Sequence, residues 1–305
     1  MDPIMLQLGP LAIRWYGFLI ALGVLLASVW ATRLAKERGL DPEKLLDMAV
    51  WLVIAGIIGA RLVYVLTSPS AFFGPGGNPL SAFYIWQGGI SFHGGLLGIM
   101  VATWLYCRIH NMNMWSYLDV MTPVAGLGII GGRIGNFMNG TDTGGRLTNW
   151  PIGFQWPEPG TETWGAFGRF VFGENLWAFY PPACGAPFAA GEVCNVHLTQ
   201  IYGALVGVLL LLVTVWALRR SRTPGFAFWH MVLWYSVLRS LIEEPFRDNP
   251  LTWKIFENTS AGVGSFTLTQ LASIIIVLIA AYMLLIMDPD REDKKERLAM
   301  KARGR

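Results

Sequence analysis

A small set of polar residues lies inside or beside long apolar runs, where charged side chains are costly. The segment 131–140, GGRIGNFMNG, places an arginine and two asparagines among small residues at the end of such a run. A guanidinium group at membrane depth needs an anionic partner, so we expect the chemistry of the protein to reside in this set. Its members are Arg61, His93, Asp119, Arg133, Asn136, Asn139, His197, Gln200, Arg239, Glu243 and Glu244.

Sequence spacing offers a partner to one of the three deep arginines. Glu243 follows Arg239 by four residues, so the two side chains are expected to pair on one face of a helix. No acidic residue has a comparable spacing from Arg61 or Arg133. We therefore expect an anionic ligand such as a phosphate beside these two, with packing and pairing as the alternative for Arg61.

Three other residues have both a chemical and a structural interpretation. His93, in GGISFHGGLLG, is either a group that moves a proton near neutral pH or a hydrogen-bonded structural group. Tyr16 either positions a substrate or forms an interfacial aromatic belt with Trp15. Gln200 either contacts a substrate or joins two helices by hydrogen bonds.

Several classes of function have no support in the sequence. It contains no CxxC, HExxH, P-loop or GxSxG motif, so we expect neither a metal nor a cofactor, and no serine-hydrolase chemistry. The formal net charge of +3 is too small to indicate a nucleic-acid partner. Cys184 and Cys194 share one polar loop, and both a disulfide and two free thiols remain open.

The composition predicts an all-α polytopic membrane protein. Only 14% of the 305 residues are charged and 53% are hydrophobic, whereas soluble proteins carry about 25% charged residues. A membrane crossing needs about twenty apolar residues. Seven transmembrane helices are expected, at residues 11–34, 46–66, 88–108, 117–135, 198–218, 225–242 and 266–287.

The distribution of Lys and Arg predicts the orientation of these spans. These residues gather after the first, third and fifth spans and in the C-terminal tail, as is typical of cytoplasmic segments. We therefore expect the N-terminus outside and the C-terminus in the cytoplasm, without a cleaved signal peptide. Residues 1–290 are expected to form a single integral-membrane catalytic domain, with 136–197 as a small extracytoplasmic head insertion and 291–305 as a charged cytoplasmic tail.

The order of motifs closely resembles that of bacterial prolipoprotein diacylglyceryl transferase. The motifs are LGPLAIRWYG, GARLVYVL, GGISFHGGLLG, GGRIGNFMNG, HLTQIYG and LRSLIEEPFR. The resemblance implies an inner-membrane enzyme that moves a diacylglyceryl group from phosphatidylglycerol to the lipobox cysteine thiol of a prolipoprotein. Glycerol phosphate leaves and a thioether forms, as the first step of lipoprotein maturation.

The resemblance also implies roles for individual residues. The key arginines of the family correspond to Arg133 and Arg239, and the histidine often assigned to proton handling corresponds to His93. Tyr16 matches the tyrosine of the first helix, so the expected catalytic residues are His93, Arg133, Arg239 and Tyr16. The expected substrate-binding residues are Arg133, Asn136, Asn139, Arg239, Glu243, Arg61, Gln200 and Arg247.

The chain departs from the family pattern at acidic positions. Thr141 follows the Asn-Gly of the signature, where relatives carry an acid, and Asp142 comes one place later. The family motif HPTQLYE has its acid where this chain has Gly203, and Leu198 replaces its proline. Asp142 and Glu244 are both candidates for the lost carboxylate.

Two alternatives of a different class remain. One is a lipid or anionic-solute transporter whose arginines bind an anion without reaction. The other is a family-derived binding or scaffold protein without transferase activity, which the missing acids leave open.

Overall fold

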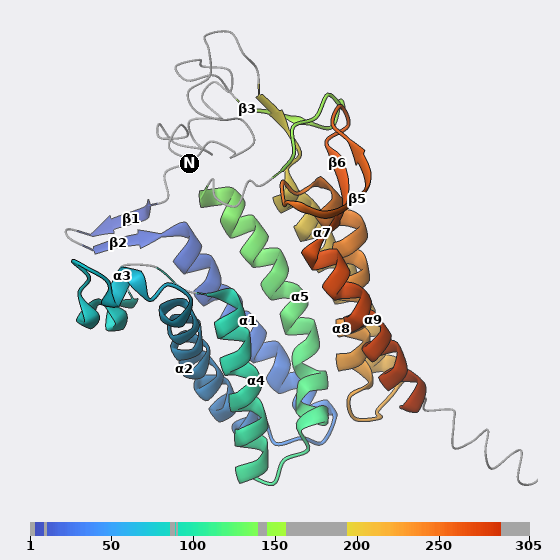
Figure 1. Ribbon diagram of the computed structural model, residues 1–305. Helices are drawn as coiled ribbons and strands as arrows, with labels where there is room; N and C mark the ends of the chain where they lie inside the picture. The colour runs from blue at the N-terminus through green and yellow to red at the C-terminus, as the bar shows by residue number, and fades with distance from the viewer. Residues whose placement is uncertain are drawn as a thin grey trace, which may run out of the picture. The chain divides into compact units, whose positions relative to one another are not determined.

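The computed structural model describes residues 4–8, 11–85, 89, 91–139, 145–156 and 194–287 (Figure 1). These residues are mostly helical, and each predicted span contains a helix. The long helices are α1 (Trp15–Glu37), α2 (Pro42–Thr67), α4 (Phe92–Ile109), α5 (Met114–Asn139), α7 (Thr199–Arg220), α8 (Phe226–Leu238) and α9 (Leu268–Ile286).

Among the described residues, α2, α7 and α9 are long and apolar enough to cross a membrane. Membrane helices are thus confirmed at this coarse level, while the count of seven spans and their orientation stay predictions. Helix α1 begins four residues later than the expected first span. The reason is that β2 (Leu11–Arg14) pairs as a strand with β1 (Ile4–Leu8).

The expectation of a purely α-helical fold misses three short antiparallel strand pairs. Beside β1 and β2, β3 (Phe154–Trp156) pairs with β4 (Cys194–Val196), and β5 (Leu251–Asn258) pairs with β6 (Val263–Thr267). Strands β2, β4 and β6 each end within three residues of the start of a helix. Pairing satisfies backbone groups outside the helices, which must find partners of their own.

The chain divides into two compact units. One comprises residues 1–27 and 121–305, and the other comprises residues 28–120. The first unit contains the C-terminal part of α5, α7, α8, α9 and the three strand pairs. The second contains α2, α4, the short helix α3 (Ser70–Phe73) and the 3₁₀ helix η1 (Pro79–Phe83). The expected single catalytic domain over residues 1–290 stays a prediction.

Helices α2 and α4 approach closely at small residues spaced by four. A methyl group on Gly98 would lie 2.2 Å from the carbonyl oxygen of Ala55, and one on Gly59 would lie 2.4 Å from that of Gly94. Small residues at this spacing let two membrane helices pack backbone against backbone. The close contact therefore depends on the absence of side chains at these positions.

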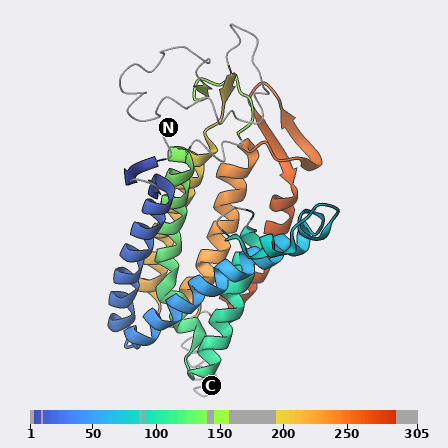
Figure 2. The same cartoon turned by 90° about the vertical axis from the view of Figure 1, so that its left-hand side faces the viewer.

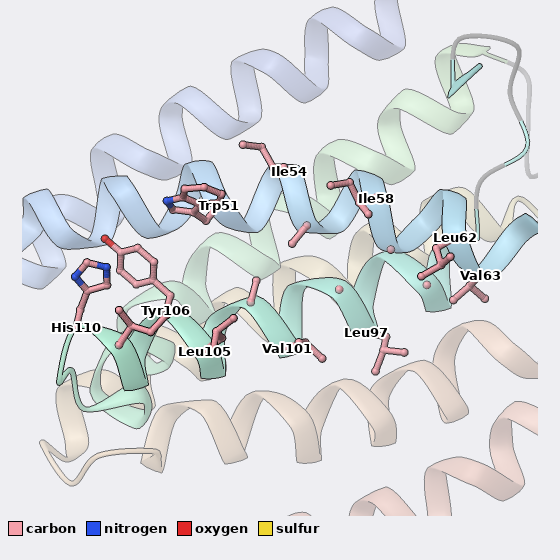
Figure 3. Close-up of a pocket in the computed structure, with 16 residues that line it drawn as sticks. Trp51, Ile54, Ile58, Leu62, Val63, Leu97, Val101, Leu105, Tyr106 and His110 are labelled. Carbon is pink, nitrogen blue, oxygen red and sulfur yellow. The ribbon is translucent and has the colours of Figure 1, made fainter. Parts of the chain in front are cut away.

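An apolar groove of about 660 Å³ runs along this helix pair (Figure 3). The rings of Tyr106 and His110 stack at one end of it, with their centroids 4.2 Å apart. Almost all of the lining is aliphatic or aromatic, so the groove suits a hydrocarbon chain or an apolar helix. Its labelled walls include Trp51, Ile54, Ile58, Leu62, Leu97, Val101 and Leu105.

Asp119, one of the polar residues found in the sequence, belongs to the packing of the second unit. Its side chain is fully buried at the start of α5, and its carboxylate lies 3.8 Å from the guanidinium of Arg38. Nearby, the backbone N–H of Asp41 donates to the hydroxyl of Tyr117 over 3.2 Å. These contacts hold the turn between α1 and α2 against the start of α5.

We predict that Gly98→Ala destabilises the protein, because the added methyl group forces the backbones of α2 and α4 apart. Overpacking of this kind costs about 1–3 kcal/mol. The matched control is Gly95→Ala on the same helix, where the nearest atoms would lie 3.5 Å away. There the higher helix propensity of Ala should leave stability unchanged or raised by up to about 1 kcal/mol. Thermal unfolding in detergent measures both, and equal melting temperatures would contradict the packing argument.

Candidate active site

The carboxylate of Glu243 lies at the centre of the site, in the first unit. Its side chain is 2% exposed, and one oxygen, Oε1, accepts hydrogen bonds from two guanidinium groups. Arg133 Nη2 donates to it from the last turns of α5. Arg247 Nη1 donates to it over 3.1 Å from the segment that follows α8. The protein therefore supplies Arg133 with an acidic partner that no local sequence spacing indicates.

A π-helical turn explains why Arg239 makes its ion pair with Glu244, although the charge of Glu243 also acts on its guanidinium. Residues Arg239–Glu243 form this turn (η5), in which the N–H of Glu244 donates to the carbonyl of Arg239, five residues earlier. A π turn holds more residues than an α turn, so position i+5 replaces i+4 on the same face. Arg239 accordingly faces Glu244, with Nε 3.7 Å from Oε2, and Glu243 turns to Arg133.

Glu244 is fully buried and is held mainly through its other oxygen. Oε1 accepts from Asn249 Nδ2 over 2.7 Å and from the hydroxyl of Thr267 over 2.9 Å. Within the described residues, neither Oε2 nor the facing Arg239 Nε makes a hydrogen bond. Arg239 Nη1 donates to the hydroxyl of Tyr235 over 2.8 Å. The guanidinium of Arg239 is thus less tightly engaged by acids than that of Arg133.

Gly203, on the first turns of α7, is the point of closest approach to the Arg133–Glu243 pair. A methyl group there would lie 2.5 Å from Arg133 Nε and 3.0 Å from Glu243 Oε2. The space next to position 203 is therefore filled by the arginine and its acid. The acid that the structure brings to this position is Glu243. Of the two candidates for the lost carboxylate, Glu244 lies beside Arg239 and Asp142 lies outside the described residues.

His197 is buried next to this cluster, between β4 and α7. Its Nε2 lies 2.8 Å from the carbonyl oxygen of Ala261, which can only accept, so Nε2 carries the proton. Nδ1 therefore accepts from the hydroxyl of Tyr202, 2.9 Å away. Burial lowers the pKa of His197 below its usual value, against a smaller opposing effect of the bond to Ala261. The ring of Phe246 packs 4.7 Å from the imidazole, measured between centroids.

Arg61 holds a loop in the second unit. Its guanidinium donates to the carbonyl oxygens of Ser81, Ala82 and Gly89 over 2.5, 2.8 and 2.6 Å. The group also lies 5.2 Å from the ring centroid of Phe72. These contacts favour the packing alternative stated for Arg61, and a substrate contact stays a prediction.

The other predicted residues are distributed over both units. His93 is an exposed residue in the first turn of α4, in the second unit. Gln200 is buried in the first turn of α7, and Asn136 is half-buried one turn after Arg133 on α5. Several further expectations concern parts of the chain outside the described residues: the side chains of Tyr16, Asn139 and Cys194, and all of Thr141, Asp142 and Cys184.

Three residues of the cluster were not singled out in the sequence. Tyr235 precedes Arg239 by four residues, a helical spacing that could have identified it as a partner. Asn249 and Thr267 contact Glu244 from segments whose proximity depends on tertiary structure. The described residues contain no group of His, Cys, Asp and Glu that could hold a metal ion.

Comparison with known proteins places this sequence in a family. The model of the family described as prolipoprotein diacylglyceryl transferase matches residues 3–286. The chain belongs to this family. All of the cluster around Glu243 and Glu244 falls within the matched range, as do α2 and α4.

Curated relatives cover almost the whole chain. A protein of Thermus thermophilus, named phosphatidylglycerol-prolipoprotein diacylglyceryl transferase, is 46% identical over 289 residues, which are 92% of this chain and 96% of the relative. A protein of the same name from Deinococcus radiodurans is 40% identical over 292 residues, covering 93% and 85%. One from Thermoanaerobacter is 28% identical, covering 95% and 96%.

We predict that His197 makes this family member less stable in acid. Because burial lowers its folded-state pKa, the unfolded chain binds more protons as the pH falls below about 6.5, and the stability present above that pH is lost. The melting temperature should therefore fall more between pH 8 and pH 5 for the wild type than for His197→Gln. Equal falls would show that other groups account for the acid sensitivity.

Proposed function

We propose that this chain transfers the diacylglyceryl group of phosphatidylglycerol to the lipobox cysteine thiol of prolipoproteins. The names of the curated relatives support the donor and the acceptor class. The observation that carries the proposal is the charge of the site. Among the described residues, the guanidinium groups of Arg133, Arg239 and Arg247 lie around the buried carboxylates of Glu243 and Glu244, and Arg239 Nε makes no hydrogen bond there.

This gathering of guanidinium groups suits the leaving group of this reaction. The cysteine sulfur forms a bond to the terminal glyceryl carbon of the diacylglyceryl group while the bond from that carbon to the phosphate oxygen breaks. The phosphodiester thereby becomes a phosphomonoester with additional negative charge. Guanidinium groups fixed in a site of low dielectric stabilise charge that develops in this way.

Arg239 is the arginine best suited to bind the donor phosphate. Its side chain is 24% exposed, and its Nε has no hydrogen bond within the described residues. The carboxylate oxygen Oε2 of Glu244 lies 3.7 Å from this Nε. Arg133 is the second phosphate ligand in this proposal, held in position by Glu243 and supported by Asn136 and Asn139. Arg247 shares Glu243 and thereby orients the same carboxylate.

The remaining roles concern the acceptor thiol and the donor glycerol. A thiol becomes an effective nucleophile when it loses its proton, so the reaction needs a base. We assign the uptake of this proton to His93. Tyr16, Gln200 and Arg61 are assigned to positioning the substrates. The proton lost by the thiol then balances the charge on the released glycerol phosphate.

The proposed setting is the bacterial cytoplasmic membrane, in contact with membrane lipids and the signal peptide of the precursor. We propose seven spans, with the N-terminus outside and residues 291–305 in the cytoplasm. Residues 1–290 form the catalytic domain in this proposal, and 136–197 its extracytoplasmic head. The apolar character of α2, α7 and α9 and the positions of Lys and Arg support it.

We predict that purified protein adds the mass of a diacylglyceryl group to a lipobox peptide when supplied with phosphatidylglycerol. Arg239→Ala should lower the rate by about 10²–10³-fold, as expected when a donor to developing charge is removed. A positioned proton acceptor raises a reaction rate by about 10²–10⁴-fold. His93→Gln should therefore lower the transfer rate by a factor within that range. Mass spectrometry of the peptide over time measures each rate.

The matched control is Arg219→Ala, which removes an exposed arginine from the other end of α7. It should retain the wild-type rate. Movement of lipid without any peptide product would instead identify a transporter, and lipid binding without product would identify an inactive scaffold. A wild-type rate in His93→Gln would make His93 a structural residue.

A second prediction concerns position 203, where the family motif has an acid and this chain has glycine. Glu243→Ala should abolish transfer and destabilise the protein by roughly 3–5 kcal/mol, because it leaves buried guanidinium charge uncompensated. Gly203→Glu alone should also lose activity, because its side chain would meet Arg133 and Glu243. The double variant with both changes should recover part of the activity and stability, since the carboxylate returns to Arg133 from α7.

Specificity of this rescue is tested on the neighbouring acid. Gly203→Glu should not rescue Glu244→Ala, because Glu244 contacts Arg239, Asn249 and Thr267 on a different side. Activity and melting temperature are measured for all five variants. Additive losses in the double variant of Glu243 and Gly203 would show that the two positions do not exchange their roles.

A further inference from the structure

The hairpin of β5 and β6 presents exposed apolar side chains beside a membrane helix. Trp253, Ile255 and Phe256 are 61%, 68% and 54% exposed. Strand β6 ends at Thr267, and α9 begins at the next residue, so hairpin and helix are continuous in both views (Figures 1 and 2). The hairpin therefore stands at the end of a helix that is long and apolar enough to cross a membrane.

An irregular register brings the exposed residues to the level at which α9 begins. Leu251 lies opposite Thr267, and regular pairing resumes at Phe256. Residues 252–255 therefore stand against the single residue Phe266, and all four are exposed. A bulge leaves the additional residues without ladder partners. Because Thr267 is the N-cap of α9, this bulge lies next to the first turn of the helix.

We propose that this bulge, residues 252–255, anchors the hairpin in the surface of the lipid bilayer. Trp253 and Ile255 insert among the first carbons of the acyl chains, where tryptophan is enriched in membrane proteins. Lys254 extends to the lipid phosphates, with its aliphatic stem along the apolar layer. Its side chain is 72% exposed, and its charge meets one acid, Glu257, at 3.3 Å.

An extended peptide is a poorer occupant of this surface. A peptide that adds to a sheet needs a regular edge of backbone donors and acceptors. The bulge interrupts that edge for four residues, as strand edges that avoid pairing commonly do. A bilayer surface requires no such register, and it is adjacent to the start of any membrane-spanning helix.

The anchor is connected directly to the candidate active site. Leu251 pairs with Thr267, and the hydroxyl of Thr267 donates to Glu244 over 2.9 Å. A hairpin fixed in the lipid surface thus holds Thr267 in place. The hydroxyl of Thr267 orients Glu244, whose carboxylate faces Arg239. The anchor itself requires that α9 crosses the bilayer, and it does not depend on the transfer reaction.

Photo-crosslinking of the full chain in lipid nanodiscs tests the anchor. A benzophenone-bearing amino acid replaces Ile255 in one variant and Thr259 in the matched control, which lies in the exposed turn at the opposite end of the hairpin. Illumination should attach lipid to the peptide that contains position 255 several-fold more than to the one that contains position 259. Equal yields, or adducts at position 255 with an added lipobox peptide in place of lipid, would overturn the proposal.

A second measurement uses the natural side chain. The emission of Trp253 is obtained as the difference between the wild type and Trp253→Phe, both reconstituted in the same nanodiscs. Lipids brominated close to the headgroup should quench this difference signal, and aqueous iodide should quench it weakly. Strong quenching by iodide without quenching by brominated lipid would place Trp253 in water and reject the anchor.

Discussion

The carboxylate of Glu243 joins two guanidinium groups that lie far apart in the sequence. Arg133 comes from the end of α5 and Arg247 from the segment after α8, and both donate to the same oxygen. In an apolar environment each of the three charges would be unfavourable alone, so the ends of these elements are held together. The absence of a side chain at Gly203 allows α7 to join the same contact.

The π-helical turn separates two consecutive carboxylates into two different environments. Glu243 faces Arg133 of α5 and Arg247 of the segment after α8, while Glu244 faces Arg239 and the hydroxyl of Thr267. An ordinary α turn would have aligned Arg239 with Glu243. Single π turns inside α-helices are frequently found at functional sites. Here the turn allows one guanidinium to be tightly fixed and another to remain accessible.

The helices could be predicted from the sequence because a helix that crosses a bilayer needs about twenty apolar residues. Lys and Arg at the ends of such runs mark where they stop. Helices occupy each segment where a run was found. The strand pairs were missed because strands of three to eight residues beside helix ends carry little periodic signal. Polar residues such as Arg133 and Glu243 could be selected by their burial cost, and the family by its motifs.

The pairing within the site could not be predicted in the same way. The ion pair of Arg239 with Glu244 was not predicted because the spacing argument assumed an unbroken α-helix, and no residue in RSLIE signals a π turn. At Gly203 the sequence shows that the acid of the family motif is missing. It does not show that the side chains of Arg133 and Glu243 fill the space beside this position. Arg61 has no acid near it in the sequence, yet backbone carbonyls can satisfy a guanidinium equally well.

The cap of α9 has a consequence for how the membrane acts on the protein. Thr267 accepts from the N–H of Gln270 at the start of α9, and its hydroxyl also contacts Glu244. The helix has 19 residues, a length of roughly 28 Å at 1.5 Å per residue, close to the roughly 30 Å of a bilayer core. A thicker or thinner bilayer changes the tilt of such a span. We therefore expect hydrophobic mismatch at α9 to reach the carboxylate beside Arg239, which would make bilayer thickness a variable of the site's geometry.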